Sequence, residues 1–331
     1  MAEKKRNCSS KIGGQAVLEG VMMKNKDDYA VAIRKPNGEI EIDVDYYKGV
    51  IGDSGLKKVP FLRGIFNFID SMILGTRLIN YSASFYDDEE AEPTKLDKAL
   101  DKISKGKGEK IIMGFTTILA IVLAVGIFIL LPFYLTDWMK GFINNASLIV
   151  IIEGILRISI FLIYVTAISF MNDIRRLYSY HGAEHKCINC IENGRPLTVR
   201  DVMRSSRLHR RCGTSFMFFV IFVSIIIFFF IRVDNIWMRA GLRIALIPLI
   251  AGISYELIRW AGNNDNIIVR ILSAPGMLIQ RLTTKEPDED MVKVAISAVE
   301  AIFDWKAYLK ESFGYDVDES WMEEEATAEE T

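Results

Sequence analysis

The chain has 331 residues, with 40 Lys or Arg against 42 Asp or Glu, so its formal net charge is −2. The length corresponds to about two domains, and without a basic bias we expect no nucleic-acid partner. Charged residues make up 25% of the chain but are absent from long stretches, and there are only four cysteines. These features exclude an ordinary soluble globule, an intrinsically disordered chain and a secreted module held together by disulfides.

Residues 12–48 are predicted to form a small β unit. Tyr29–Arg34 and Glu39–Val44 alternate in character and flank Pro36-Asn37-Gly38, a typical turn sequence. Before them lies the glycine-rich segment Gly13–Met23. We interpret it as a tight turn between strands; a loop that binds phosphate or a lipid headgroup is the less favoured alternative, because the spacing is not that of a P-loop.

The next segment, Gly55–Ser84, mixes basic and apolar residues. This pattern predicts either an interfacial or re-entrant helix beside a membrane or a core helix of a cytoplasmic domain, with no preference between the two. Residues 1–86 therefore form the first predicted region. Residues 87–110 are charged and are predicted to be a linker.

Four apolar stretches between residues 111 and 258 predict a multi-span, mainly α-helical membrane domain, because about 20 apolar residues are needed to cross a bilayer as a helix. Two of them contain no charged residue, whereas the second contains Glu153 and Arg157 on one helix face and the fourth contains Arg243, Pro248 and Glu256. The charged face of the second stretch, with Glu153 and Arg157, is expected to point toward protein. The four predicted spans are Ile111–Leu135, Leu148–Met171, Thr214–Ile231 and Ala240–Ile258.

The distribution of basic residues predicts the topology. Residues 172–213 contain nine Lys or Arg against four acids, whereas the connections 136–147 and 232–239 contain one and two basic residues. By the positive-inside rule, the 172–213 segment and both termini are cytoplasmic. The first long apolar run begins after residue 110, so no cleavable signal peptide is expected.

Residues 259–331 are predicted to be a cytoplasmic segment. Thr283–Pro287 is expected to open a helix that continues through Met291–Trp305, since proline is tolerated in the first turn of a helix. The tail from Asp316 contains eight acidic residues and is predicted to be disordered.

All three histidines of the chain and three of its four cysteines lie close together, between residues 181 and 212. His181 and His185 are spaced as H-x-x-E-H, the pattern of inverted zincins, in which two histidines on one helix face bind zinc and the glutamate acts as a general base. The pattern predicts a divalent metal site, most readily for Zn²⁺, with Glu184 as the base. The other residues of the cluster are His209, Cys187, Cys190 and Cys212.

The segment is predicted to be a helical hairpin. One helix continues to Gly194 as C-cap, and a second begins at Thr198–Asp201 and runs toward Cys212. If the turn lies near Arg195, equal residue counts place His209 and Cys212 at the height of His181. Glu256 is a candidate for the distal carboxylate.

Structural explanations compete with this interpretation. A histidine pair at this spacing is often accidental, and Cys187 and Cys190 form a single C-x-x-C without the second pair that a structural zinc site needs. Arg207, Arg210 and Arg211 can belong to the positive-inside belt or bind anionic lipid headgroups.

Five motifs carry a family resemblance: Gly13–Met23, Tyr180–Lys186, Arg211–Phe216, Ser254–Glu256 and Thr283–Pro287. Through these motifs, residues 11–300 resemble the bacterial YqhQ-like family (DUF1385). The resemblance implies a membrane protein of the bacterial cell membrane and a predicted metal-dependent enzyme, without a named substrate. His209-Arg210-Arg211-Cys212 replaces the family's His-Pro-Arg-Cys, which predicts a looser turn, and the family pattern lacks Cys187 and Cys190. The expected ligands are therefore His181, His185, His209 and Cys212, with Glu256 as a fifth.

Three hypotheses follow. The first is a metal-dependent hydrolase at the cytoplasmic face of the lipid bilayer. The second is a membrane scaffold or assembly factor, with a protein partner or a second copy of the chain, in which a closed site of four ligands holds a structural metal. The third is a lipid-binding or transport protein, motivated by the charges within the spans.

The topology can be tested by labelling single cysteines introduced into a cysteine-free chain in intact cells. We expect a membrane-impermeant thiol reagent to label sites in the 136–147 connection and to spare sites in residues 172–213, because the latter are predicted to be cytoplasmic. Strong external labelling within residues 172–213 would contradict the topology.

Overall fold

The computed structural model describes residues 9–86, 108–143, 145–231, 233, 235–264 and 266–314. The predicted linker, apart from residues 108–110, and the acidic tail lie outside these ranges. The described chain is mainly helical, with a small antiparallel sheet at its start. It forms two compact units: the first draws on residues 1–86, 165–220 and 251–331, and the second on residues 87–164 and 221–250.

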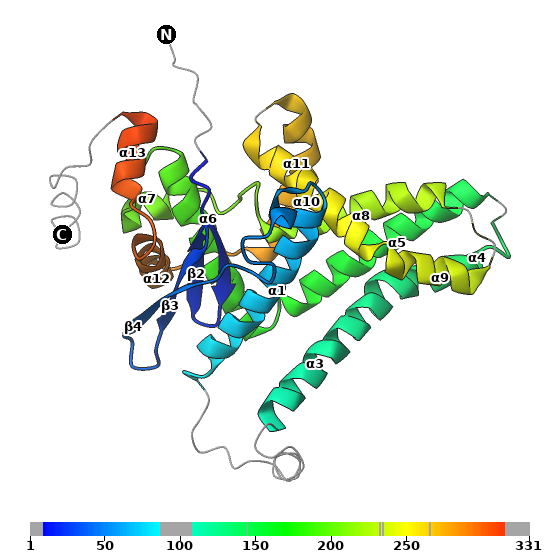
Figure 1. Ribbon diagram of the computed structural model, residues 1–331, viewed down its shortest axis with the longest axis horizontal. Coiled ribbons are helices and arrows are strands. Elements are labelled where there is room, and N and C mark those ends of the chain that lie inside the picture. The colour runs from blue at the N-terminus through cyan, green and yellow to red at the C-terminus, as the bar shows by residue number, and fades with distance from the viewer. Residues whose placement is uncertain are drawn as a thin grey trace. The chain divides into compact units, whose positions relative to one another are not determined.

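The sheet of the first unit is a four-stranded antiparallel meander in the order β1-β2-β3-β4 (Figure 1). Two-residue loops at 18–19 and 26–27 join the first three strands, and Gly38, with φ +88°, turns the chain between the last two. The predicted β unit is confirmed, and Gly13–Met23 is a hairpin, as interpreted. The strands are β1 (Gly13–Val17), β2 (Gly20–Asn25), β3 (Asp28–Arg34) and β4 (Ile40–Tyr46).

Helices cover both faces of this sheet, because its central strands are apolar on both sides. Val21 and Met23 point to one face, where they pack with α6 (Asn172–Glu192) and α12 (Glu289–Glu300). Met22, between them, points to the other face and packs with α1 (Leu62–Ala83). This alternation is the two-residue period of a strand. Two short elements, the 3₁₀ helix η1 (Gly55–Lys58) and α7 (Val199–Met203), also belong to this unit.

One side of α1 is part of the core. Leu74 and Leu78 are buried against the sheet, whereas Ile69, Met72 and Ile73 are 38–46% exposed on the helix. The alternative that Gly55–Ser84 contains a core helix is therefore confirmed for the face of α1 that packs against the sheet. The interfacial placement stays a prediction.

The C-terminal region differs from the expected single helix. Helix α11 (Ile267–Thr283) ends where the predicted helix was to begin, and α13 (Trp305–Phe313) begins where it was to end. Residues Thr284–Pro287, between α11 and α12, have no helical structure, and together with Thr283, the last residue of α11, we call them the strap. The Asp288 side chain accepts a hydrogen bond from the Met291 N–H (2.8 Å), so it is the N-cap that starts α12.

Three helices among the described residues are long and apolar enough to cross a membrane, or four if one bent pair counts as a span. The bent pair is α9 (Ile236–Ala245) and α10 (Ile247–Asn263), which meet at 43°. Pro248 lacks the N–H that would continue the helical ladder, so the fourth predicted span is not a single straight helix. The three long helices are Gly114–Met139 (α3, Gly108–Val125; the π-helix η2, Gly126–Leu130; α4, Leu131–Met139), α5 (Ala146–Ile168) and α8 (Gly213–Phe230).

The charges predicted to face protein are buried and paired inside the second unit. Glu153 accepts hydrogen bonds from Arg157 (2.8 Å) and from Arg243 (2.6 Å). Arg157 also donates to the Ser224 hydroxyl (2.6 Å) and to the carbonyl of Phe128 in η2 (3.2 Å). A single carboxylate therefore bridges two buried guanidinium groups.

Glu153→Gln keeps the size of this side chain but removes its charge, which leaves two buried cations without a counter-charge. We expect the free energy of unfolding to fall by about 3–5 kcal/mol, measured by denaturant titration in detergent micelles. Glu311→Gln, at an exposed position of α13, is the control and should have little effect. Equal stability of the two variants would mean that the bridge contributes nothing.

Candidate metal centre

The H-x-x-E-H segment lies in the buried half of α6, which begins at Asn172 and ends at Glu192. His181 and His185 are one turn apart, with ring centroids separated by 4.4 Å. Gly182, between them, faces the strap: a Cβ atom at this position would lie 2.0 Å from the carbonyl oxygen of Lys285. The absent side chain lets the main chain of the strap lie directly on the helix.

Hydrogen bonds to backbone carbonyls set the tautomers of both histidines. Nδ1 of His181 lies 3.0 Å from the carbonyl oxygen of Thr283, and Nδ1 of His185 lies 2.7 Å from that of Arg207. Because a carbonyl oxygen only accepts, each Nδ1 must carry the hydrogen. Each Nε2 then keeps its lone pair, which is how protein histidines are prepared to bind a metal.

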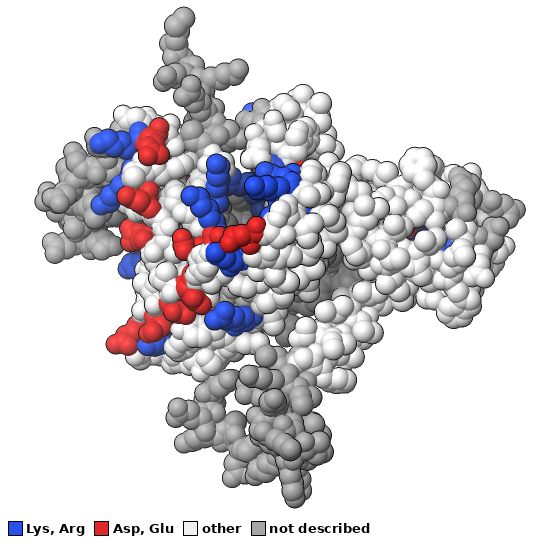
Figure 2. Space-filling model, in the orientation of Figure 1, with Lys and Arg blue, Asp and Glu red and all other residues white. Residues whose placement is uncertain are grey.

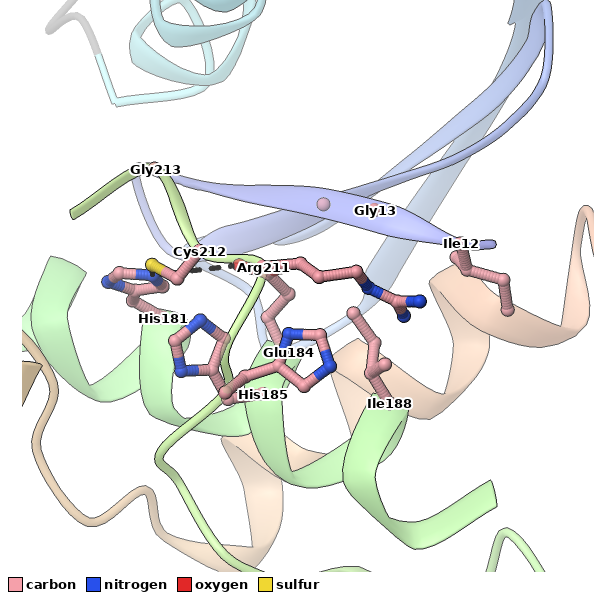
Figure 3. A pocket seen from close by; sticks show the side chains of 11 residues that line it. Ile12, Gly13, His181, Glu184, His185, Ile188, Arg211, Cys212 and Gly213 are labelled. Atoms are coloured by element: carbon pink, nitrogen blue, oxygen red, sulfur yellow. Dashed lines mark hydrogen bonds and ion pairs between the residues drawn. The ribbon is translucent and has the colours of Figure 1, made fainter. Parts of the chain in front are cut away.

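Cys212 completes a group of three candidate ligands with the two histidines. Its Sγ is 3.2 Å from Nε2 of His181, and one donor atom from each residue lies within 4.8 Å of the others. Zn–N bonds of about 2.0–2.1 Å and a Zn–S bond of about 2.3 Å imply tetrahedral ligand separations of about 3.3–3.6 Å. The group therefore fits a zinc-sized ion after small adjustments. Figure 3 shows the three side chains side by side.

Glu184 borders this group without belonging to it. Its Oε2 lies 4.0 Å from Nε2 of His181, and its carboxylate accepts a hydrogen bond from the backbone N–H of Gly14 in β1. Burial raises the pKa of Glu184 to about 7, although His181 and the Gly14 N–H act in the opposite direction. A carboxylate with a pKa near neutral is suited to exchange protons with a reacting group.

A small cavity of about 100 Å³ is enclosed by these residues. Strand β1 covers one side of it, and Figure 3 shows Gly13 on this strand above the side chains of α6. A Cβ atom on Gly14 would lie 2.7 Å from Cγ of Glu184. Glycine is required here because the strand approaches the carboxylate so closely.

His209 lies beside this group but outside it. Its ring centroid is 5.7 Å from that of His185, while its Nε2 is 3.4 Å from a carboxylate oxygen of Glu192. The side chain of Gln280 pairs with the His209 backbone, accepting from its N–H (2.9 Å) and donating to its carbonyl (2.7 Å). The structure thus places His209 in a second polar cluster rather than among the three candidate ligands.

Glu192 is the centre of that second cluster. It accepts hydrogen bonds from Ser10 (2.8 Å) and forms an ion pair with Arg211. Burial by itself would raise the pKa of Glu192, but the contacts with His209 and Arg211 outweigh it and hold the pKa at about 2. Burial lowers the pKa of His209, and the Glu192 carboxylate opposes this.

The predicted helical hairpin is wrong in its second half. Helix α7 has only five residues, Val199–Met203, and residues 204–212 contain no helix. Two antiparallel helices therefore do not bring His209 and Cys212 to the level of His181, as the equal residue counts had predicted. Cys212 reaches His181 because the chain returns as an irregular loop of turns and bends, which the side chain of Lys186 holds by donating to the carbonyls of Met203 (2.7 Å) and Ser205 (3.0 Å).

Glu256, the expected fifth ligand, lies on α10 and is engaged elsewhere. It forms a bidentate ion pair with Arg63 of α1 and also lies 3.3 Å from the Phe61 N–H. Cys187 and Cys190 are buried and belong to the core that α6 forms with α12. Burial raises the pKa of the Cys187 thiol, which disfavours the thiolate form that binds metals.

Sequence reasoning missed the residues that support the ligands. The strap supplies the Thr283 carbonyl, and the backbone of Lys285 donates to the Tyr178 carbonyl (2.9 Å). The residue type of Thr283 carries no signal for this role, because the backbone makes the contact. Gly14 did carry a signal, since a glycine-rich strand is typical of a close backbone approach.

The described residues define a mainly helical protein with three or four helices able to span a membrane and a cluster of two histidines and a cysteine. A family model described as "Protein of unknown function (DUF1385)" matches residues 59–305. The chain is 36% identical over 287 residues to "Uncharacterized protein YqhQ" of Bacillus subtilis (strain 168). The aligned residues cover 86% of this chain and 90% of that protein. The chain belongs to the DUF1385 family, as its motifs predicted. No solved structure matches it.

Two adjacent glycines offer a matched test of the site. Gly14→Ala places a methyl group 2.7 Å from both the Glu184 side chain and the Met22 carbonyl, whereas a Cβ atom on Gly13 meets nothing within 4 Å. We expect Gly14→Ala to lower the free energy of unfolding by about 1–3 kcal/mol, the usual cost of overpacking, and Gly13→Ala to change it little. Denaturant titration of both variants measures this, and equal effects would contradict the close approach of β1 to Glu184.

Proposed function

We propose that this protein is a zinc-dependent hydrolase that acts at the cytoplasmic face of the bacterial cell membrane. The observation that carries the proposal is the pair of Nδ1–carbonyl hydrogen bonds of His181 and His185, which leave the Nε2 lone pair of each ring available for a metal in the group with Cys212. A packed histidine also needs an acceptor for its ring N–H, but here two fixed tautomers lie one helical turn apart beside a cysteine. Metal-binding histidines commonly have them.

Among the residues that the structure describes there are three candidate protein ligands rather than four, which favours a catalytic site over a structural one. Catalytic zinc sites use three protein ligands and keep one position for water or substrate, whereas structural sites are closed by four. His209 is the residue whose position decides between these possibilities, and it contacts Glu192. The site is also accessible, because several of its residues line a larger cleft as well.

Each residue then has a distinct role. His181, His185 and Cys212 would hold the ion. When bound, zinc supplies Lewis-acid activation of water and of a substrate carbonyl or phosphoryl group. Glu184 would accept the proton of the attacking water at Oε2 and pass it to the leaving group, since this carboxylate lies next to the ligands without being one of them.

Metal content per chain, measured by elemental mass spectrometry after identical purification, tests the ligands. We expect His181→Ala, His185→Ala and Cys212→Ser to lose most of the zinc, because each removes an inner-sphere donor. Glu184→Gln should keep the metal and, once a substrate is known, lower the rate by about 10²–10⁴-fold, as is typical when a general base is lost.

Matched controls come from the same cluster. Cys190→Ala and His209→Ala remove the same residue types outside the group of three and should retain zinc. Loss of zinc in His209→Ala would make the site a closed four-ligand centre and would favour the scaffold hypothesis. Full zinc content in both His181→Ala and His185→Ala would end the metal assignment.

A Co²⁺-substituted protein tests the open position directly. Addition of a small coordinating inhibitor, such as acetohydroxamate, should change the visible spectrum of the cobalt if a coordination position is open. A structural site with four protein ligands would give no change, which would overturn the hydrolase proposal while leaving the metal site intact.

A further inference from the structure

A cleft of about 900 Å³ opens beside the metal centre within the first unit. Gly14, His181, Glu184 and Cys212 line both this cleft and the small cavity, so the two are neighbours with a common wall. The volume lies toward the upper end of the range of about 300–1,000 Å³ that is usual for small-molecule sites. A ligand in the cleft can therefore contact the proposed catalytic residues.

One side of the cleft is apolar and is built largely from helices. Phe68 of α1 and Phe216 of α8 lie against each other, with ring centroids 5.5 Å apart. Phe216 and Met217 belong to the first turns of α8, which begins directly after Cys212 and is apolar enough to cross a membrane. The apolar wall therefore continues onto a candidate membrane span.

The remaining lining is rich in cations. Lys24 is half-buried and its Nζ donates to the Tyr47 carbonyl (3.1 Å), and Nζ of Lys57 donates to the Lys48 carbonyl. Figure 2 shows Lys and Arg side chains bordering a hollow beside α10 and α11. The basic residues that line the cleft are Lys11, Lys24, Lys26, Lys48, Lys57 and Arg211.

Most of these cations lack a carboxylate partner. Lys48 pairs with Asp53 and Arg211 with Glu192, whereas Lys11, Lys24, Lys26 and Lys57 form no ion pair among the residues that the structure describes.

Among the residues that the structure describes, three carboxylates line the cleft, from Asp27, Asp70 and Glu184. Asp70 is already bonded to the Tyr47 hydroxyl (3.2 Å) and the Val50 N–H (2.7 Å). Burial lowers the pKa of Lys24, and the nearby charges of Asp27 and Asp70 only partly oppose this. The cleft thus has an excess of positive charge that an anion would compensate.

We propose that the cleft binds an anionic membrane lipid, with its headgroup at Lys24 and Lys57 and an acyl chain along the wall of Phe68, Phe216 and Met217. The combination of unpaired lysines and an apolar wall that continues onto α8 carries this inference, because a soluble anion would need only the lysines. The inference deepens the proposed function: an anionic lipid, or a molecule attached to one, becomes the substrate class of the hydrolase.

The test uses the full-length protein in a neutral detergent and measures lipid binding by native mass spectrometry over a concentration series. We expect phosphatidylglycerol to bind at least tenfold more tightly than phosphatidylcholine. The double variant Lys24→Gln/Lys57→Gln should weaken phosphatidylglycerol binding by about fivefold for each lysine, the contribution of a basic residue near an anionic lipid surface. Lys293→Gln/Lys306→Gln, which removes the same charge outside the cleft, should bind as the wild type does.

Equal phosphatidylglycerol binding by the two double variants, or equal binding of the two lipids by the wild type, would overturn the proposal. Glycerol 1-phosphate is the third probe. If it binds as tightly as phosphatidylglycerol and with the same dependence on the lysines, the ligand is a soluble phosphate and the lipid assignment is wrong.

The metal and lipid measurements fail independently. If the wild type contains no zinc but its phosphatidylglycerol binding depends on Lys24 and Lys57, the hydrolase proposal falls and the lipid site stands. If zinc is bound but phosphatidylglycerol and phosphatidylcholine bind with equal affinity, the hydrolase proposal stands and the lipid site falls.

Discussion

Two hydrogen bonds from histidine rings to backbone carbonyls hold the candidate metal centre in its geometry. The carbonyl groups belong to Arg207, in the loop after α7, and to Thr283, at the start of the strap. Both segments must therefore lie against α6 before either Nε2 points toward Cys212. The loop is held by Lys186 and the strap by the N–H of Lys285, so the main chain around the site is fixed by α6 itself.

Helix α6 accepts these neighbours because two glycines remove side chains at the contacts. Gly182 on the helix leaves room for the Lys285 carbonyl, and Gly14 on β1 leaves room for the Glu184 side chain. A main chain without side chains can approach a helix closely enough to hydrogen bond with residues on its surface. The motifs at Gly13–Met23, Tyr180–Lys186 and Thr283–Pro287 are thus parts of one packing arrangement.

Local patterns predicted the features that depend on nearby residues. The β unit, the long apolar helices, the pairing of Glu153 with Arg157, and α6 with its two histidines all follow from spacing along the chain. The features that failed depend on tertiary contacts. The helix expected to reach Cys212 is a loop because its backbone groups bond to Lys186 and Gln280 instead. The pairing of Glu256 with Arg63 joins residues 193 positions apart, which no local pattern reveals.

The position of the strap in the sequence determines when the site can form during synthesis. Thr283 follows His181 by 102 positions, and α8 to α11 lie between them. At about 5–20 residues per second, roughly 5–20 s pass before the second carbonyl is available. During that time the Nδ1–H of His181 cannot bond to the Thr283 carbonyl. Gly14 of β1, in contrast, has already been synthesised. Under the proposed function, metal would therefore bind only after α8 to α11 have been synthesised, so it would not be a nucleus around which the chain folds.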